Sequence, residues 1–128
     1  MKKYIIVAVI VIVVAACILG IKYLKSVHDY KEKVKNIVIN DVNLENKEDG
    51  EYFGEFDVDF IAAKVEVDIK DKKISNIKLI EHKNERGAKA EVIPERVVKA
   101  QSLKVDAVSG ATNSSKVILK AIQNALDK

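Results

Sequence analysis

The sequence predicts an α+β protein in which an apolar N-terminal transmembrane helix precedes a small antiparallel sheet packed with helices. The first observation is an uncharged run from Tyr4 to Ile21, which is long enough for most of a membrane span. The second is the alternation of apolar and charged residues between residues 51 and 80, which is typical of strands with one buried face. The third is a set of apolar residues at spacings of three and four near the C-terminus, which indicates a helix packed on that sheet.

Residues 1–25 are predicted to be a membrane anchor. From Tyr4 to Leu24 the only charged residue is Lys22, and at about 1.5 Å per residue a helix of this length matches the bilayer core. In lipid the backbone must satisfy its own hydrogen bonds, so a helix forms although Val and Ile dominate the segment. A cleaved signal peptide is the main alternative, because Met1–Lys3 followed by an apolar stretch is its usual opening.

Cys17 lies inside this apolar run and has two interpretations. Val14–Cys17 resembles a lipoprotein processing site, in which small residues precede a lipid-modified cysteine. Ile18–Ile21 nevertheless continues the apolar run, where a mature lipoprotein usually turns polar. We therefore expect Cys17 to be a small lipid-facing residue, with lipidation as the alternative. Either outcome anchors the domain to a membrane.

The charge distribution argues against a nucleic-acid-binding protein. Three of the 22 Lys and Arg residues lie in residues 1–24, which contain no acidic residue. The remaining 19 are balanced by all 19 Asp and Glu, whereas a nucleic-acid binder needs a clustered basic excess. Cys17 is the only cysteine, and His28 and His82 are the only histidines, which excludes a disulfide framework and a zinc site built from Cys and His.

Residues 26–48 are predicted to form a stalk helix and a linker. The stalk carries apolar residues at helical spacings: Val27, Tyr30, Val34 and Ile37. This helix continues from the anchor or follows it closely. A short strand is expected over residues 38–44, and Asn residues with Asp49–Gly50 then break the pattern ahead of a globular domain over residues 49–128.

The predicted sheet covers Glu51 to Ile80. Its apolar residues alternate with charged ones along two strands and continue in a returning strand: Phe56, Val58, Phe60, Ala63, Val65, Val67, Ile69, Ile74, Ile77, Leu79 and Ile80. Asp71–Lys72 is expected to form the hairpin turn, although it lacks a glycine.

Three more elements are predicted after Gly87, where the pattern becomes less regular. Pro94 suits the first position of a helix that runs through about Ser102, because its missing N–H would be unpaired there. A strand is expected over residues 104–108. The last helix has one apolar face: Val117, Ile118, Ala121, Ile122, Ala125 and Leu126.

The segment Asp106–Thr112, with the sequence DAVSGAT, is the candidate for chemistry. Gly110 permits a tight turn and the close approach of another molecule, and Ala111 keeps that approach open. The Thr112 hydroxyl is expected at the start of the last helix, where a phosphate would face unpaired backbone N–H groups and the positive end of the helix dipole. Hydroxyl and Asn side chains are also ordinary helix caps, so the residues alone leave both interpretations open.

Asp106–Thr112 resembles the flavinylation motif of the FMN-binding domain family, which includes the C subunit of sodium-translocating NADH:quinone reductase and the G subunit of the Rnf complex. In that family FMN is joined by a phosphoester to the final threonine of the motif, here Thr112, by a flavin transferase that uses FAD as donor. The resemblance covers roughly residues 49–127 and includes further segments: Asp49–Gly54, His82–Gly87, Gln101–Leu103 and Ser114–Ser115. It implies that residues 49–128 form an FMN-binding domain with a covalent FMN.

The resemblance also implies the residues of the site. Those that would bind the cofactor are Thr112, Ser109, Gly110, Ala111, Asn113, Ser114, His82 and Gly87. Those that the transferase would recognise are Asp106, Ser109, Gly110, Ala111 and Thr112.

Two of these positions have alternative interpretations. His82 near the flavin could stabilise reduced, anionic flavin, or it is simply a half-exposed histidine at a strand end. Asp106 serves recognition by the transferase or caps a turn. Lys83–Arg86 departs from the threonine and small residues of many relatives, so the wall of the flavin pocket is expected to differ.

The function implied is that of a membrane-anchored flavoprotein that relays electrons between a donor and an acceptor not identified by the sequence. More lysines follow the span than precede it, which alone would favour a cytoplasmic domain. Family members work outside the cytoplasm, so we expect the domain on the extracytoplasmic side of the cell membrane. A covalent tether suits a domain with no Trp and few aromatic residues, because weak contacts suffice when the ligand cannot leave.

Other classes of function are less well supported. No general base, metal cluster or substrate pocket is evident in the sequence, so we expect an electron carrier rather than a stand-alone enzyme. The alternative is a flavin-free, membrane-anchored module that is pilin-like or binds another ligand. Pilins need a glutamate near the start of the apolar segment and a glycine just before it, and this chain has neither.

Overall fold

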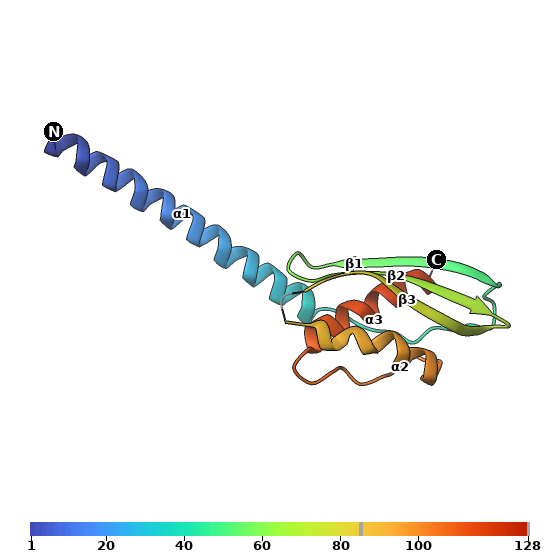
Figure 1. The fold of residues 1–128 in the computed structure, drawn as a ribbon. Coiled ribbons are helices and arrows are strands. Elements are labelled where there is room, and N and C mark those ends of the chain that lie inside the picture. Colours follow the sequence, from blue (N-terminus) through green and yellow to red (C-terminus); the bar gives the residue numbers. More distant parts are fainter. Residues whose placement is uncertain (85, 128) are drawn as a thin grey trace. The chain divides into compact units, whose positions relative to one another are not determined.

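The computed structural model describes residues 1–84 and 86–127. Its contacts divide the chain into two compact units, Met1–Glu32 and Lys33–Lys128. Helix α1 (Lys2–Lys35) begins in the first unit and ends in the second. The predicted stalk helix is therefore continuous with the apolar segment. Figure 1 labels the helices and strands.

The first unit is the apolar part of α1. Among the described residues α1 is the one helix long and apolar enough to cross a membrane. Its large apolar side chains from Tyr4 to Leu24 are exposed within the chain, so nothing in the unit itself covers them. An exposed apolar surface of this extent is typical of a segment that contacts lipid.

The second unit contains a three-stranded antiparallel sheet, as the alternation predicted. Strands β1 (Gly50–Asp57), β2 (Ala62–Lys70) and β3 (Lys73–Lys83) lie in sequence order, with β2 in the centre. Val65, Val67 and Ile69 of β2 are buried, whereas Lys64 and Lys70 are exposed. One face of the sheet therefore forms the core.

The predicted hairpin turn at Asp71–Lys72 is confirmed. Asp71 and Lys72 have φ values of 52° and 62°, as a two-residue turn between twisted antiparallel strands requires. The Asp71 N–H donates a hydrogen bond of 2.8 Å to Asp49 Oδ1. This contact fixes the turn against the residue that precedes β1, which offsets the absence of glycine.

Helices form the second layer, on the apolar face of the sheet (Figure 1). They are a short 3₁₀ helix η1 (Ala88–Val92), α2 (Ile93–Ala100) and α3 (Thr112–Leu126). Helix α3 packs on β1 and β2, whereas α2 packs on β3. The largest fully buried apolar side chains come from the sheet, the helices and the loops that join them: Ile74, Ile93, Leu103, Ile118, Ile122, Val58, Val65, Val67, Val97 and Val117.

Gly54 of β1 permits the close packing of α3. A Cβ at this position would overlap the backbone of Ala121 and Ala125. The small side chains of those two alanines are fully buried. Glycine facing two alanines thus brings the helix backbone directly onto the strand, which sets the position of the whole of α3.

The strand predicted over residues 38–44 is wrong. This segment has no regular structure, and its backbone groups bond to side chains instead of a neighbouring strand. The Asn40 N–H donates to Gln123 Oε1 at 3.1 Å, and Lys120 Nζ donates to the Val38 carbonyl at 3.2 Å. Helix α3 therefore satisfies backbone groups that a strand partner would otherwise have to satisfy.

The strand predicted over residues 104–108 is also wrong. The Val108 N–H donates to Ser115 Oγ, and the Asp106 carbonyl accepts from Arg96 Nη1, so side chains again replace a strand partner. Helix α2 ends at Ala100 rather than Ser102, because Gln101 adopts a φ of 52°. The Gln101 side chain then bonds both backbone groups of Ile74, at 2.7 and 2.8 Å.

Candidate functional site

The segment between Val108 and Ala111 forms a tight turn. The Ala111 N–H donates to the Val108 carbonyl at 2.9 Å. Gly110 occupies the third position of this turn with a φ of 82°, a conformation that favours glycine. The sequence SGA therefore reverses the chain immediately before α3 begins.

Ser115 fastens this turn to the helix. Its hydroxyl accepts a hydrogen bond from the Val108 N–H at 2.9 Å and donates one to the Ala111 carbonyl at 2.8 Å. Ser115 is fully buried, so these bonds are shielded from water. The residues on both sides of Gly110 are thus held to the first turn of α3.

Thr112 is the first residue of α3, and it is exposed. The N-cap residue is Ala111, which has a φ of −139° and forms no side-chain cap. Thr112 is therefore not the capping residue; it occupies the first position of the helix, in the turn whose backbone N–H groups have no partner within a helix. This is the position that the motif predicted for a phosphate.

His82 lies beneath the first turn of α3 rather than at the surface. Only 2% of its side chain is exposed, and Nε2 lies 3.1 Å from Ser114 Oγ. Nδ1 lies 3.9 Å from Glu91 Oε1. Burial lowers the pKa of His82 below its usual value, and the nearby carboxylate of Glu91 opposes this shift only in part. The His82 side chain is therefore not half-exposed at the strand end, whereas its role near a flavin stays a prediction.

Asn84 connects His82 to the loop that follows β3. Its Nδ2 donates to the His82 carbonyl at 3.3 Å and lies 3.4 Å from His82 Nδ1. Its Oδ1 accepts from the Gly87 N–H at 3.0 Å. An Asn84 amide that donates to Nδ1 requires the proton of a neutral His82 to be on Nε2, which is the tautomer in which His82 donates to Ser114 Oγ.

Gly87 completes this cluster. A Cβ at Gly87 would overlap the Ser114 side chain, so the loop reaches α3 only because the residue is glycine. The structure thus brings together three of the predicted site residues, and it buries Gly87, Ser114 and the side chain of His82.

The other predicted site residues form a separate, outer group. Five of them are exposed in and beside the turn: Asp106, Ser109, Gly110, Thr112 and Asn113. Ala111 is only 5% exposed, so it contacts the protein interior. The site has an exposed outer layer that contains the Thr112 hydroxyl and a buried layer that holds the first turn of α3 in place.

Sequence reasoning missed three residues of the site, namely Asn84, Glu91 and Ser115. Asn84 falls within Lys83–Arg86, the segment identified as a departure from relatives, although Glu85 lies outside the described residues. The Ser114–Ser115 pair was visible as part of the resemblance, but the buried role of Ser115 was not. Glu91 carried no distinguishing pattern.

Residues 59–127 match the family model of the FMN-binding domain, a region that spans more than half of the chain. The chain belongs to the FMN-binding domain family. The match includes the whole segment Asp106–Thr112 and the residues that contact one another around His82, namely Asn84, Gly87 and Ser114. It begins ten residues after the predicted start at Asp49. No curated protein matches the chain.

The N-terminal segment has a match of its own. Residues 1–17 match the prokaryotic membrane lipoprotein lipid attachment site, and the match ends at Cys17. The FMN-binding domain is thus part of a membrane-anchored, extracytoplasmic lipoprotein. Our preference for Cys17 as a plain lipid-facing residue of a spanning helix is corrected, because this match favours a lipid anchor.

Proposed function

We propose that this protein carries FMN as a phosphoester on Thr112 and relays electrons between redox partners at the outer side of the membrane. The observation that carries the proposal is the placement of Thr112. An exposed hydroxyl occupies the first position of α3, whose N-cap residue offers no side-chain cap. Membership of the FMN-binding domain family supplies the cofactor, and the geometry supports the attachment point.

The residues around Thr112 suit a phosphate. The first backbone N–H groups of a helix and its dipole favour an anion, and α3 is 15 residues long. Gly110 adjoins open space, so the approach to the turn is clear. Ser115 bonds the turn to the first turn of α3, which would restrict the positions open to the Thr112 hydroxyl. FMN would supply electron-transfer chemistry, and the protein would supply position and shielding.

Attachment requires a modifying partner, a flavin transferase that uses FAD. A phosphoester bond would form between Thr112 Oγ1 and the FMN phosphorus, the bond from that phosphorus to AMP would break, and the Thr112 proton would be released. The exposed Asp106, Ser109 and Gly110 lie beside Thr112 and would be the surface that the transferase contacts. Buried Ala111 would instead keep the turn compact.

The anchor is proposed to be a lipid on Cys17. The match to a lipid attachment site that ends at this residue supports it. A lipid there and the apolar residues after it would hold the FMN-binding domain at the membrane surface, where a lost cofactor could not readily be replaced. A covalent FMN suits such a location, because the tether keeps its effective concentration high.

In-gel flavin fluorescence after denaturation tests the attachment. The chain is produced in the membrane with a flavin transferase, and three forms are compared: the wild type, Thr112→Val and Thr112→Ser. We expect a fluorescent band for the wild type and none for Thr112→Val, which keeps the side-chain shape without the hydroxyl. Thr112→Ser restores the hydroxyl and is expected to restore at least part of the signal. A wild-type band without fluorescence would favour a flavin-free binding module.

A further inference from the structure

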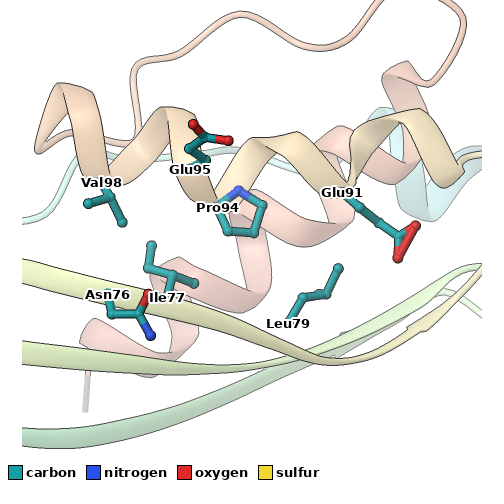
Figure 2. Close-up of a pocket in the computed structure, with 7 residues that line it drawn as sticks. All are labelled: Asn76, Ile77, Leu79, Glu91, Pro94, Glu95 and Val98. Atoms are coloured by element: carbon teal, nitrogen blue, oxygen red, sulfur yellow. The ribbon is translucent and has the colours of Figure 1, made fainter.

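Most of the exposed large apolar side chains in the described residues lie between Tyr4 and Leu24 of α1. Those of the second unit are few and come from separate segments: Val38, Phe53, Ile80 and Val92. The groove between β3 and α2 offers no continuous apolar surface, because Glu91 and Glu95 line it beside the aliphatic side chains (Figure 2). The main surface for an apolar partner is therefore on α1.

The residues after the lipid attachment site have an apolar face. The match to that site ends at Cys17, so a chain lipidated there retains the residues that follow. Residues i, i+4 and i+7 of a helix share a face, which places Ile21 and Leu24 on the face of Cys17. Both side chains are 67% exposed. An apolar face therefore begins at the proposed lipid and continues for two turns.

A cationic face lies beside the apolar one. By the same spacing Lys22 and Lys25 share the face of Ile18, and both lysines are exposed. No Asp or Glu precedes Asp29 in the sequence. Among the described residues neither ammonium group has an ion-pair partner. This face is therefore complementary to an anionic surface.

We propose that Cys17–Lys25 lies along the membrane surface as an interfacial helix and contacts anionic phospholipid headgroups. Ile21 and Leu24 would lie beside the acyl chains, and Lys22 and Lys25 would extend to the headgroups, because lysine can bury its stem and keep its charge in water. The inference rests on the lipid proposed at Cys17 and not on the flavin proposed at Thr112. It adds a lipid-selective contact to the anchor.

The length of the apolar face favours this orientation. The next two positions on the face of Leu24 are His28 and Lys31, so the face ends at Leu24. From Cys17 to Leu24 a helix rises about 12 Å, whereas crossing the bilayer core takes about 20 residues. The part of α1 that follows the lipid is therefore too short to span the membrane, and its apolar face is covered only when the helix lies at the surface.

The same placement gives a role to the lysines that follow the apolar run. By count alone they favour a cytoplasmic domain, yet the lipoprotein is extracytoplasmic. Headgroup contacts of Lys22 and Lys25 on the outer side would account for lysines at these positions.

Tryptophan substitution in the lipidated chain tests the orientation. The chain has no Trp, so Leu24→Trp and Ile18→Trp each introduce a single reporter. After intact mass has shown the lipid, both variants are placed in vesicles of phosphatidylcholine and phosphatidylglycerol with brominated acyl chains. We expect stronger bromine quenching for Leu24→Trp than for Ile18→Trp, although residue 24 is farther from the lipid along the chain. The reverse order would indicate a helix that leaves the membrane upright, and it would overturn the proposal.

Charge substitution tests the headgroup contact. In the Leu24→Trp chain, Lys22→Gln with Lys25→Gln is compared with Lys70→Gln with Lys89→Gln, a control that removes two exposed lysines from the second unit. Bromine quenching should increase as phosphatidylglycerol replaces phosphatidylcholine in the parent and the control, and it should not respond in Lys22→Gln with Lys25→Gln.

Two results would overturn the inference. A parent chain whose quenching is the same in both lipids would contradict the anionic headgroup contact. A chain without lipid would remove the anchor on which the inference rests. The flavin content is measured separately by intact mass, so a missing FMN would contradict the proposed function at Thr112 and leave the membrane contact intact.

Discussion

The buried hydroxyl of Ser115 holds the backbone N–H of Val108 at 2.9 Å, which fastens the glycine turn to the first turn of α3. The same hydroxyl donates to the Ala111 carbonyl, so one side chain bonds to both ends of the turn. Thr112 follows directly and is exposed. The position of Thr112 at the start of α3 thus depends on a residue that is fully buried.

Ser115→Ala should destabilise the domain and impair flavin attachment. The Val108 N–H would lose its partner, and a buried unsatisfied group costs about 1–3 kcal/mol. Urea unfolding of the chain in detergent measures the stability, and in-gel fluorescence measures attachment. Ser109→Ala removes an exposed hydroxyl from the same turn and should leave the stability nearly unchanged. Equal stability of the two variants would argue against the fastening role of Ser115.

Alanine substitutions at Gly54 and Gly110 should differ in cost. At Gly54 a Cβ would overlap the backbone of α3, so helix and sheet must separate, at a cost of about 3 kcal/mol. At Gly110 the space is open and only the φ of 82° is unfavourable, at about 1 kcal/mol. The same unfolding experiment compares them. A larger loss at Gly110 would mean that α3 does not approach β1 as closely as described.

His82 should make the domain less stable in mildly acidic solution. Burial lowers its pKa in the folded state, so the unfolded chain binds the proton more tightly. The stability is fully present above the unfolded pKa of about 6.5 and is lost as the pH falls from there through the lowered folded pKa. The difference in unfolding free energy between the wild type and His82→Gln isolates this contribution from the carboxylates.

Two further measurements check the His82 environment. NMR titration should give His82 a lower pKa than an ordinary histidine, and Glu91→Gln should lower it further, because the carboxylate favours the charged ring. A pKa for His82 at or above the usual value, or no response to Glu91→Gln, would contradict the buried position.

The anchor is tested by metabolic labelling with a fatty-acid probe. The wild-type chain should incorporate the probe, and Cys17→Ser should not, because the serine hydroxyl cannot replace the thiol as the attachment point. Gly20→Ala, another small substitution in the same apolar segment, should be labelled like the wild type. Absence of label in the wild type would restore the interpretation of a plain spanning helix.

Much of the fold was predictable because local patterns determine it. The alternation in β2, the turn at Asp71–Lys72 and the proline at the start of α2 each have a physical reason that lies within a few residues. The two failed strands, over residues 38–44 and 104–108, have the composition of strands. Side chains from distant residues such as Gln123 and Ser115 satisfy their backbone groups, and nothing in the local sequence indicates this.

The two layers of the site also differ in how far the sequence could predict them. Its exposed layer lies in one continuous segment, so the resemblance of Asp106–Thr112 was sufficient to find it. Its buried layer joins His82 to Ser114, 32 residues apart, through a loop held by Asn84. Contacts between such distant residues depend on the sheet and helix being assembled, which is why Asn84 and Glu91 were missed.

Intact-mass measurement of the chain, produced with an active flavin transferase, tests the central claim most directly. The wild type should be heavier than the same chain produced without the transferase by one FMN less one water, and Thr112→Val should show no such increase. A wild type that gains no flavin mass, or the same increase in Thr112→Val, would contradict attachment at Thr112.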